Sequence, residues 1–268
     1  MAHPAVVLVV AGWDPSGAAG LAQDFKVLAS LGVHACGAPA ALTVQGGQGV
    51  AQVQGVEAGL LRAQLRALLA EQPVAAIKLG LLYGPDQVAV VAEALAGFPK
   101  LPLVIDPVLG ASAGGSLVAP GFVEALKAQL LPRATLCTPN LAEAATLGGF
   151  APARQRQELP AQAQALRVLG PQAILLKGGH LDGAFSPDLY VDASQEAWLE
   201  APRVDTANSR GTGCSLAAAA AAFLAQGAGP LDACRQAKAL LTRALLASAQ
   251  DRWPQASGPL RFPFEPLS

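Results

Sequence analysis

The chain has 268 residues, of which 52% are hydrophobic and 14% charged, and its 18 basic and 19 acidic side chains give a net charge of −1. This composition excludes a disordered chain, and the balanced charge argues against a nucleic-acid-binding or membrane-surface protein, so we expect a small-molecule partner. The length suits one α/β domain, and the sequence shows no linker or internal repeat that would divide residues 1–268.

Strand-like and helix-like segments alternate along the sequence. Short, continuously apolar runs are typical of strands buried on both faces, and leucines at helical spacing, as in 57–71, predict amphipathic helices. In chain order we expect strands over 6–11, 38–44, 75–79, 103–105, 135–138 and 173–177, alternating with helices over 17–31, 57–71, 85–95, 118–131 and 161–169. A short hairpin of 189–191 with 198–200, helices over 213–226 and 231–247, and a surface tail from Trp253 complete the chain.

This alternation predicts an α/β protein with a three-layer α/β/α fold and a mainly parallel central sheet. Ligands of such sheets bind at the carboxyl ends of the strands. Polar residues and glycines follow the expected strands at that edge, among them Gly12, Gln45, Asp106, Asn140 and Gly178. We therefore look for the functional site there.

The segment SRGTGCSLAAAAAAFLAQG, residues 209–227, begins with a glycine-rich turn that leads into a helix. A helix N-terminus exposes unpaired N–H groups and partial positive charge, and Gly211 and Gly213 leave room for a bulky anion. The simpler interpretation is a capped helix start, with Thr212 or Ser209 as the cap. An isolated G-x-G pattern favours that simpler interpretation.

Cys214 follows this turn at the start of the helix. A thiol in such a position has a lowered pKa and is partly thiolate. The alternative is a small apolar residue that packs beneath the turn, since free cysteines are usually buried and inert. The residue alone does not separate these alternatives, but the scarcity of histidines argues against a cysteine protease.

Two carboxylates and a lysine stand at the same expected edge. Asp106 follows the apolar run LPLVI, and Glu143 lies three residues after Asn140, where it either helps to hold Mg²⁺ with Asp106 or closes a capping box. Lys177 ends the apolar strand AILLK, so it needs a negative partner, which is either a phosphate or an Asp or Glu side chain. Together with the glycine turn, these residues indicate phosphoryl transfer without a Walker-type loop.

The expected location is the cytoplasm. We see no signal peptide and no apolar stretch of roughly 20 residues that would span a membrane. The four cysteines are far apart in the sequence, with no CxxC pair or Cys/His ligand spacing, which argues against structural zinc and disulfides.

Across nearly its whole length the sequence resembles the hydroxymethylpyrimidine/phosphomethylpyrimidine kinases of the ribokinase superfamily. The resemblance rests on AGWDPSGAAGLAQDFKVLASLGVHACGAPAALTVQ, IKLGLL, VIDPVLGASAGG, LLPRATLCTPNLAEAATLGG, ILLKGGHLDG and NSRGTGCSLAAAAAAFLAQG, all in order. It implies a ribokinase-like fold, commonly a homodimer, and two phosphorylations in thiamine biosynthesis with ATP and Mg²⁺. The first acts on 4-amino-5-hydroxymethyl-2-methylpyrimidine and the second converts its monophosphate to the diphosphate.

The resemblance also implies roles for single residues. Gln45 matches the glutamine that recognises the aminopyrimidine edge, and Asp24 matches an aspartate that faces the substrate. Cys214 matches the position that faces the reacting hydroxyl, as a base or as a hydrogen-bonding element. The matching pocket-lining positions are Gly12, Val44 and Val108, and the matching anion-hole positions are Gly211, Thr212, Gly213 and Cys214.

Several residues depart from the family pattern. Trp13 replaces a usual serine, Gly46-Gly47 follow Gln45 in place of Asn-Thr, and Arg210 replaces a histidine, which leaves open whether both phosphorylations are retained. We expect Trp13 to stack on the pyrimidine and Arg210 to bind a substrate phosphate, unless Arg210 points to solvent or pairs with a carboxylate such as Asp205. The alternatives are a pyridoxal-type kinase and a non-catalytic binding protein.

Overall fold

The computed structural model describes residues 3–110, 115–253 and 257–262, and the strands in this part form a single nine-stranded sheet in the order β3-β2-β1-β4-β5-β6-β7-β8-β9. The strands are β1 (Val6–Trp13), β2 (His34–Gly46), β3 (Gly49–Gly55), β4 (Val74–Leu79), β5 (Leu103–Ile105), β6 (Leu136–Cys137), β7 (Ala173–Lys177), β8 (Phe185–Val191) and β9 (Glu196–Pro202). Neighbours from β2 through β7 pair in parallel, and β3, β8 and β9 pair antiparallel. The mainly parallel sheet is therefore confirmed.

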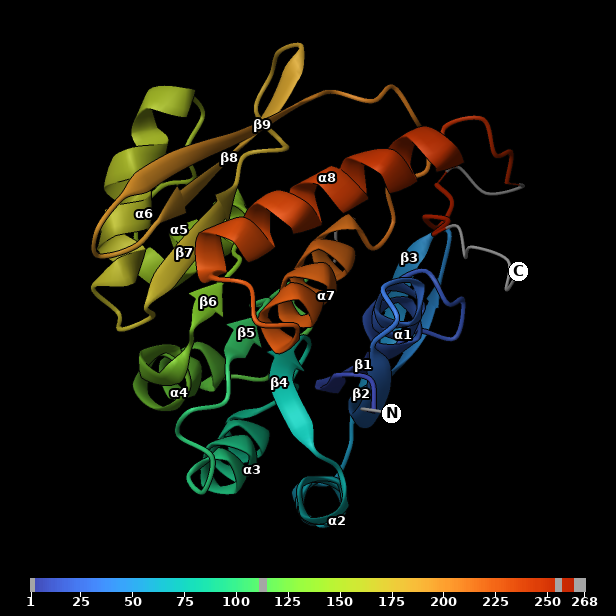
Figure 1. Cartoon of the computed structure of the whole chain (residues 1–268), viewed down its shortest axis with the longest axis vertical. Coiled ribbons are helices and arrows are strands. Elements are labelled where there is room, and N and C mark those ends of the chain that lie inside the picture. Colours follow the sequence, from blue (N-terminus) through green and yellow to red (C-terminus); the bar gives the residue numbers. More distant parts are fainter. Residues whose placement is uncertain (1–2, 111–114, 254–256, 263–268) are drawn as a thin grey trace.

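Helices cover both faces of this sheet. They are α1 (Gly20–Ser30), α2 (Ala58–Glu71), α3 (Pro85–Leu95), α4 (Phe122–Gln129), α5 (Leu141–Gly148), α6 (Leu159–Arg167), α7 (Thr212–Ala225) and α8 (Pro230–Ser248), with short 3₁₀ turns at Leu131–Arg133 and Arg156–Glu158. Figure 1 shows α7 and α8 packed side by side across one face. No helix in the described ranges combines the length and apolar character needed to cross a membrane.

The alternation of side chains along β1 separates two hydrophobic cores. Val6, Leu8 and Val10 join the core beneath α2 to α6, while Val7 and Val9 join the core beneath α1, α7 and α8. A strand that is apolar at every position therefore contributes side chains to both cores. The sheet thus lies between two layers of helices, which gives the three expected layers.

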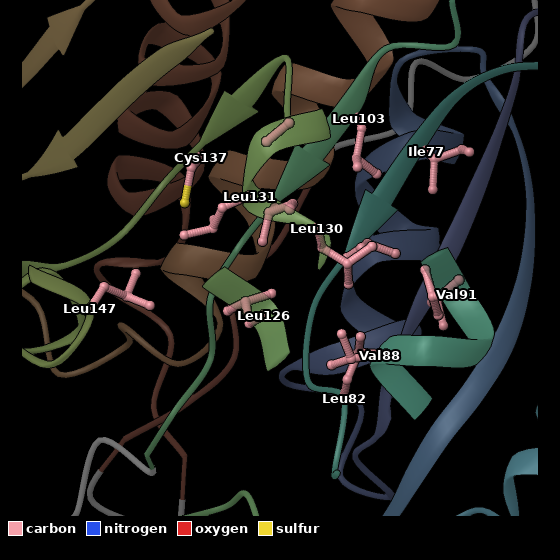
Figure 2. Packing of buried hydrophobic residues seen from close by; sticks show 14 of the residues in the cluster. Ile77, Leu82, Val88, Val91, Leu103, Leu126, Leu130, Leu131, Cys137 and Leu147 are labelled. Carbon is pink, nitrogen blue, oxygen red and sulfur yellow. The ribbon is translucent and has the colours of Figure 1, made fainter. Parts of the chain in front are cut away.

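Figure 2 shows part of the first core. Ile77 and Leu103 come from the sheet, and Val88, Val91 and Leu126 come from the helices that cover it. Close packing of this kind fixes the strand ends from which the polar side chains project.

The strand order reverses at β1. From β1 the chain passes outward to β2 and β3, and then returns to place β4 on the other side of β1. Ligands of open α/β sheets bind at such a reversal, at the carboxyl ends of the strands. Helix α7 packs against β1, β4 and β5, so its N-terminus is close to this point.

The expected elements are mostly found, with four differences. Strand β3 was missed, and the expected 118–131 helix begins only at Phe122 because Pro120 and Gly121, with φ of +79°, precede it. The hairpin of β8 and β9 is longer than expected. In the tail, 254–256 and 263–268 lie outside the described residues, but Leu260 and Phe262 are buried in the second core rather than laid over the surface.

Candidate active site

Three buried carboxylates, one buried lysine and one partly buried lysine form a charged cluster at the carboxyl edge of the sheet. Lys177 Nζ lies 2.8 Å from Asp106 Oδ1 and 3.9 Å from Glu143 Oε2. Lys78 Nζ lies 2.7 Å from Asp24 Oδ2, and both of these side chains are completely buried. The cluster therefore carries one more negative than positive charge if every group is ionised.

Backbone hydrogen bonds between strand ends fix two of these side chains. The Asp106 N–H donates to the Leu79 carbonyl at 2.9 Å, directly after β5 ends, and Thr138 Oγ1 donates to Asp106 Oδ1 at 3.3 Å. Lys177 ends β7, and its N–H donates to the Pro139 carbonyl at 2.9 Å. The parallel strands thus bring together residues that are 71 positions apart in the sequence.

Glu143 caps a helix and also faces Lys177. The Asn140 side chain accepts hydrogen bonds from the N–H groups of Ala142 and Glu143, and Glu143 Oε2 accepts one from the Asn140 N–H at 2.7 Å. This is the capping box that we considered as the alternative to a metal ligand. Because the same oxygen lies 3.9 Å from Lys177 Nζ, the two roles are compatible.

Burial and the excess of negative charge shift the pKa values of the cluster. Burial, with a further contribution from Asp106, raises the pKa of the Glu143 carboxyl to about 7 against the attraction of Lys177. Burial raises the pKa of Asp24 to about 6, although Lys78 opposes this. The pKa of Asp106 is lowered, because the charges of Lys177 and Lys78 outweigh its burial. Glu143 and Asp24 are therefore the carboxyls of this network whose pKa values come nearest to neutral pH.

The glycine-rich turn forms an uncapped helix N-terminus beside the cluster. Gly211 is the N-cap of α7 with φ of +77°, and among the described residues no side chain, from Thr212 or Ser209 or elsewhere, caps the helix. A Cβ on Gly211 would lie 2.1 Å from the Ala18 carbonyl oxygen, so only glycine fits there. The simpler interpretation of a side-chain cap is therefore wrong, and the first-turn N–H groups are left for another acceptor.

Gly213 faces the charged cluster directly. A Cβ at this position would lie 3.1 Å from Lys177 Nζ and 3.8 Å from Asp106 Oδ2. The ammonium group and the helix N-terminus thus converge on one small volume, which is positive on two sides.

Cys214 carries a neutral thiol in this arrangement. Burial raises its pKa to about 11, and Asp24 and Asp106 add to the effect, while Lys78 and a backbone hydrogen bond from Gly20 oppose it. The lowered pKa that we considered for a helix-start thiol is therefore wrong here, because desolvation and two carboxylates outweigh the nearby positive charge.

Arg210 pairs with a carboxylate, as one of the expected alternatives proposed, but the partner is Asp14 and not Asp205. Its Nη2 lies 3.2 Å from Asp14 Oδ2 and 2.9 Å from Ser16 Oγ. Asp14 also accepts hydrogen bonds from the N–H groups of Ser16 and Ala18. The guanidinium thus connects the loop after β1 to the glycine-rich turn.

The residues expected to contact the pyrimidine surround the ends of β1, β2 and β5. Gly12 is buried against Leu81, and Val108 is half-buried two residues after Asp106. Val44 and Gln45 lie near the end of β2, where Val44 is 59% exposed and the Gln45 Oε1 accepts a hydrogen bond from Thr43. Val44 can line a pocket only when a ligand covers it.

Lys78 is a site residue that we missed. It interrupts the apolar strand sequence VAAIKL, and a buried lysine requires a negative partner. That partner is Asp24, 54 residues away on α1, and the other Asp24 oxygen, Oδ1, is buried without a hydrogen-bond partner in the described structure. The signal was a lysine within an apolar strand.

The donor set fits Mg²⁺ together with phosphate oxygens. In the described residues no group of three or more His, Cys, Asp or Glu side chains is arranged to hold a metal. Mg²⁺ is usually bound by one or two carboxylates with phosphates and retained waters, and Asp106 and Glu143 supply two.

Comparisons with known proteins show the family to which the chain belongs. A family model described as phosphomethylpyrimidine kinase matches residues 14–260. A hydroxymethylpyrimidine/phosphomethylpyrimidine kinase of Rhizobium meliloti is 40% identical over 256 residues, 96% of each chain. A thiamine biosynthesis bifunctional protein of Geobacter sulfurreducens is 36% identical over 239 residues, 89% of this chain and 49% of that protein. The structure of pyridoxal kinase from Staphylococcus aureus with AMP-PCP and pyridoxal superposes with a TM-score of 0.87 at 29% identity, covering 97% of this chain and 93% of that one.

Proposed function

Because the chain belongs to the phosphomethylpyrimidine kinase family, we propose that the edge formed by Lys177 and the Gly211–Cys214 turn transfers the γ-phosphoryl group of ATP to a hydroxymethylpyrimidine. The fold is the ribokinase-like α/β fold, and the protein is a kinase of thiamine biosynthesis. The alcohol and its monophosphate are the two substrates that the family name implies.

The observation that carries this proposal is the convergence on Gly213. The uncapped N–H groups of α7 and the Lys177 ammonium face the same small volume. Phosphoryl transfer spreads negative charge over the phosphoryl oxygens, so fixed donors placed there stabilise the transition state without reorganisation. The absence of a side chain on Gly213 leaves space for those oxygens.

Asp106 and Glu143 would hold Mg²⁺ in this scheme, directly or through water. When bound, Mg²⁺ neutralises charge on the phosphates of ATP. Asp106 also keeps Lys177 extended toward Gly213 through the 2.8 Å ion pair, so this carboxylate orients the ammonium as well.

Cys214 serves as a hydrogen-bonding element at the reacting hydroxyl, and not as a resting thiolate. A thiol with a pKa of about 11 is protonated at neutral pH. This supports the anion-hole role among the two that the family resemblance left open.

Six residues are assigned to the pyrimidine and its phosphate. The Gln45 amide has both a donor and an acceptor for an aminopyrimidine edge, and Asp24 Oδ1 offers a buried acceptor without a partner. Gly12, Val44 and Val108 line the ring. For the second phosphorylation we assign the substrate phosphate to Arg210, which shares its guanidinium between that phosphate and Asp14.

A pyridoxal kinase is the second candidate, since the pyridoxal-bound structure superposes over 97% of this chain. A binding protein without activity is disfavoured by the intact cluster of Asp106, Lys177 and Glu143. We further propose a homodimer in the cytoplasm, as the family resemblance implies.

Release of ADP from ATP, followed with a coupled assay, tests the function. The purified protein is given hydroxymethylpyrimidine, its monophosphate or pyridoxal, each with MgATP. Turnover with both pyrimidines that exceeds turnover with pyridoxal supports the proposal. Preference for pyridoxal selects the second candidate, and no turnover with any of the three favours a binding protein. The Lys177→Met variant controls for contaminating kinases.

A further inference from the structure

The turn that carries the anion hole is held from behind by the C-terminal segment. Asn208, three residues before Gly211, is 2% exposed, although it is polar and lies in a loop. Its Nδ2 donates to the carbonyls of Ser248 at 2.6 Å and Asp251 at 2.8 Å, at the end of α8. Its Oδ1 accepts from the Gly258 N–H at 3.0 Å. This buried amide is therefore fully used in joining three segments of the chain.

The backbone continues the connection. The Arg210 N–H donates to the Gly258 carbonyl at 3.3 Å, and Arg210 pairs with Pro259 in a short parallel bridge. Beyond this bridge, Leu260 and Phe262 are buried in the core beneath α7 and α8. Figure 1 shows the end of α8 and the C-terminal segment on the same side of the molecule as the connection that leads into α7.

On its other side the turn meets the loop after β1. Arg210 Nη2 reaches Asp14 and Ser16, and Gly211 packs against the Ala18 carbonyl. The residues just before the anion hole are thus fixed between two walls, one built from the loop 14–18 and the other from segment 257–262. Neither wall belongs to the charged cluster itself.

We propose that segment 257–262 is a brace for the anion hole, and that Asn208 is the positioning residue through which it acts on phosphoryl transfer. This inference rests on the proposed kinase function. Positioning matters because a misplacement of about 1 Å in a preorganised site lowers the rate on the order of 100-fold. The brace would set kcat, and affinity for the unphosphorylated pyrimidine would change little, because none of its contacts involves the residues assigned to the pyrimidine ring. Affinity is compared with this substrate because Arg210, which the brace contacts, is assigned to the phosphate of the monophosphate.

Two variants break the same contact from opposite sides. Asn208→Ala removes the amide. Gly258→Ala keeps it, but the new Cβ would lie 2.3 Å from Asn208 Oδ1 and 2.2 Å from Trp253 Cδ1. Trp253 is 51% exposed and has room to move, so the displacement falls on Asn208. Tyr190→Phe is the matched control, because it removes a partly buried hydrogen bond, from the Tyr190 hydroxyl to Asp192, at a residue of the same core.

The test measures kcat, KM for ATP and pyrimidine, and Tm for each variant and for the double variant Asn208→Ala/Gly258→Ala. We expect kcat to fall by about 10-fold or more in each single variant, with KM changed less than about threefold and no further loss in the double variant. Tyr190→Phe should lower Tm and leave kcat unchanged.

Several outcomes would overturn the proposal: wild-type kcat in either folded single variant, additive losses in the double variant, or a loss of kcat in Tyr190→Phe that matches its loss of Tm. If Asn208→Ala does not fold, Gly258→Ala alone decides. Gly213→Val separates this test from that of the proposed function. If only the brace proposal is wrong, Gly213→Val still loses activity. If the anion-hole proposal is wrong, Gly213→Val stays active.

Discussion

Gly213 offers the sharpest separation of activity from stability. It is the second residue of α7, and a Cβ there would lie 3.1 Å from Lys177 Nζ, closer than side-chain carbons usually approach. In Gly213→Ala the ammonium must give way by a few tenths of an ångström. In Gly213→Val the branched carbons extend about 1.5 Å further and fill the space assigned to the phosphoryl oxygens.

The two effects have opposite signs. Replacing a helical glycine by alanine stabilises a helix by up to about 1 kcal/mol, and by less in the first turn, so Gly213→Ala should keep or slightly raise Tm. Losing one anion-hole interaction raises the barrier by about 3 kcal/mol, which is on the order of 100-fold in kcat. We expect that loss in Gly213→Val and about 10-fold in Gly213→Ala.

The assay is steady-state ADP release with Tm measured on the same samples. Gly229→Ala is the control, because Gly229 is also at a helix start and has φ of −69°. A Cβ there would meet no heavy atom of the described residues within 4 Å. It should leave kcat unchanged. Unaltered kcat in a folded Gly213→Val protein would refute the anion hole.

Three further predictions address the remaining assignments. Gln45→Leu should weaken pyrimidine binding by about 1–3 kcal/mol in calorimetry without changing ATP affinity, whereas Gln54→Leu, on the exposed β3, should change neither; equal pyrimidine affinity in both would remove Gln45 from the site. Arg210→His should raise KM for the monophosphate selectively, and equal effects on both substrates would leave Arg210 only its Asp14 contact. Glu143→Gln should raise the Mg²⁺ concentration for half-maximal rate. Because burial raises the folded-state pKa of Glu143 to about 7 from an ordinary 4.5, its contribution to stability is present below pH 4.5 and lost as pH rises through 7. Without Mg²⁺, the wild-type Tm should fall as the pH rises through 7, and the part of this fall that comes from Glu143 should disappear in Glu143→Gln. A variant whose Tm depends on pH as the wild type does would contradict this.

The alternation of elements was predictable because both faces of the sheet are covered. A strand such as β1, apolar at every position, is recognisable without its neighbours. Strand β3, GVAQVQG, lies at the edge and alternates small and polar residues, so neither its composition nor its burial distinguishes it from a loop. The start of α4 was misplaced because apolar spacing continues through Pro120 and Gly121.

The site was predictable as far as topology alone determines it. Parallel strands must end at one edge, so Asp106 and Lys177 were expected near each other. Contacts that depend on how a helix or tail packs were not visible in the sequence. The pairing of Lys78 with Asp24 and of Asn208 with Gly258 joins residues 50 or more positions apart, without a pattern that links them.

Lys177 shows why two interpretations that looked exclusive belong together. Phosphate and carboxylate were alternative partners for this lysine. An ammonium buried without any partner would be strongly destabilising, so in the unliganded protein a carboxylate must hold it, and Asp106 does so at 2.8 Å. That bond points the ammonium at Gly213, where a phosphoryl group would arrive. A divalent cation held by Asp106 and Glu143 would offset the negative charge that the phosphates of ATP bring to this edge. The same carboxylates thus position the lysine before ATP binds and favour the metal-bound form of the nucleotide when it does.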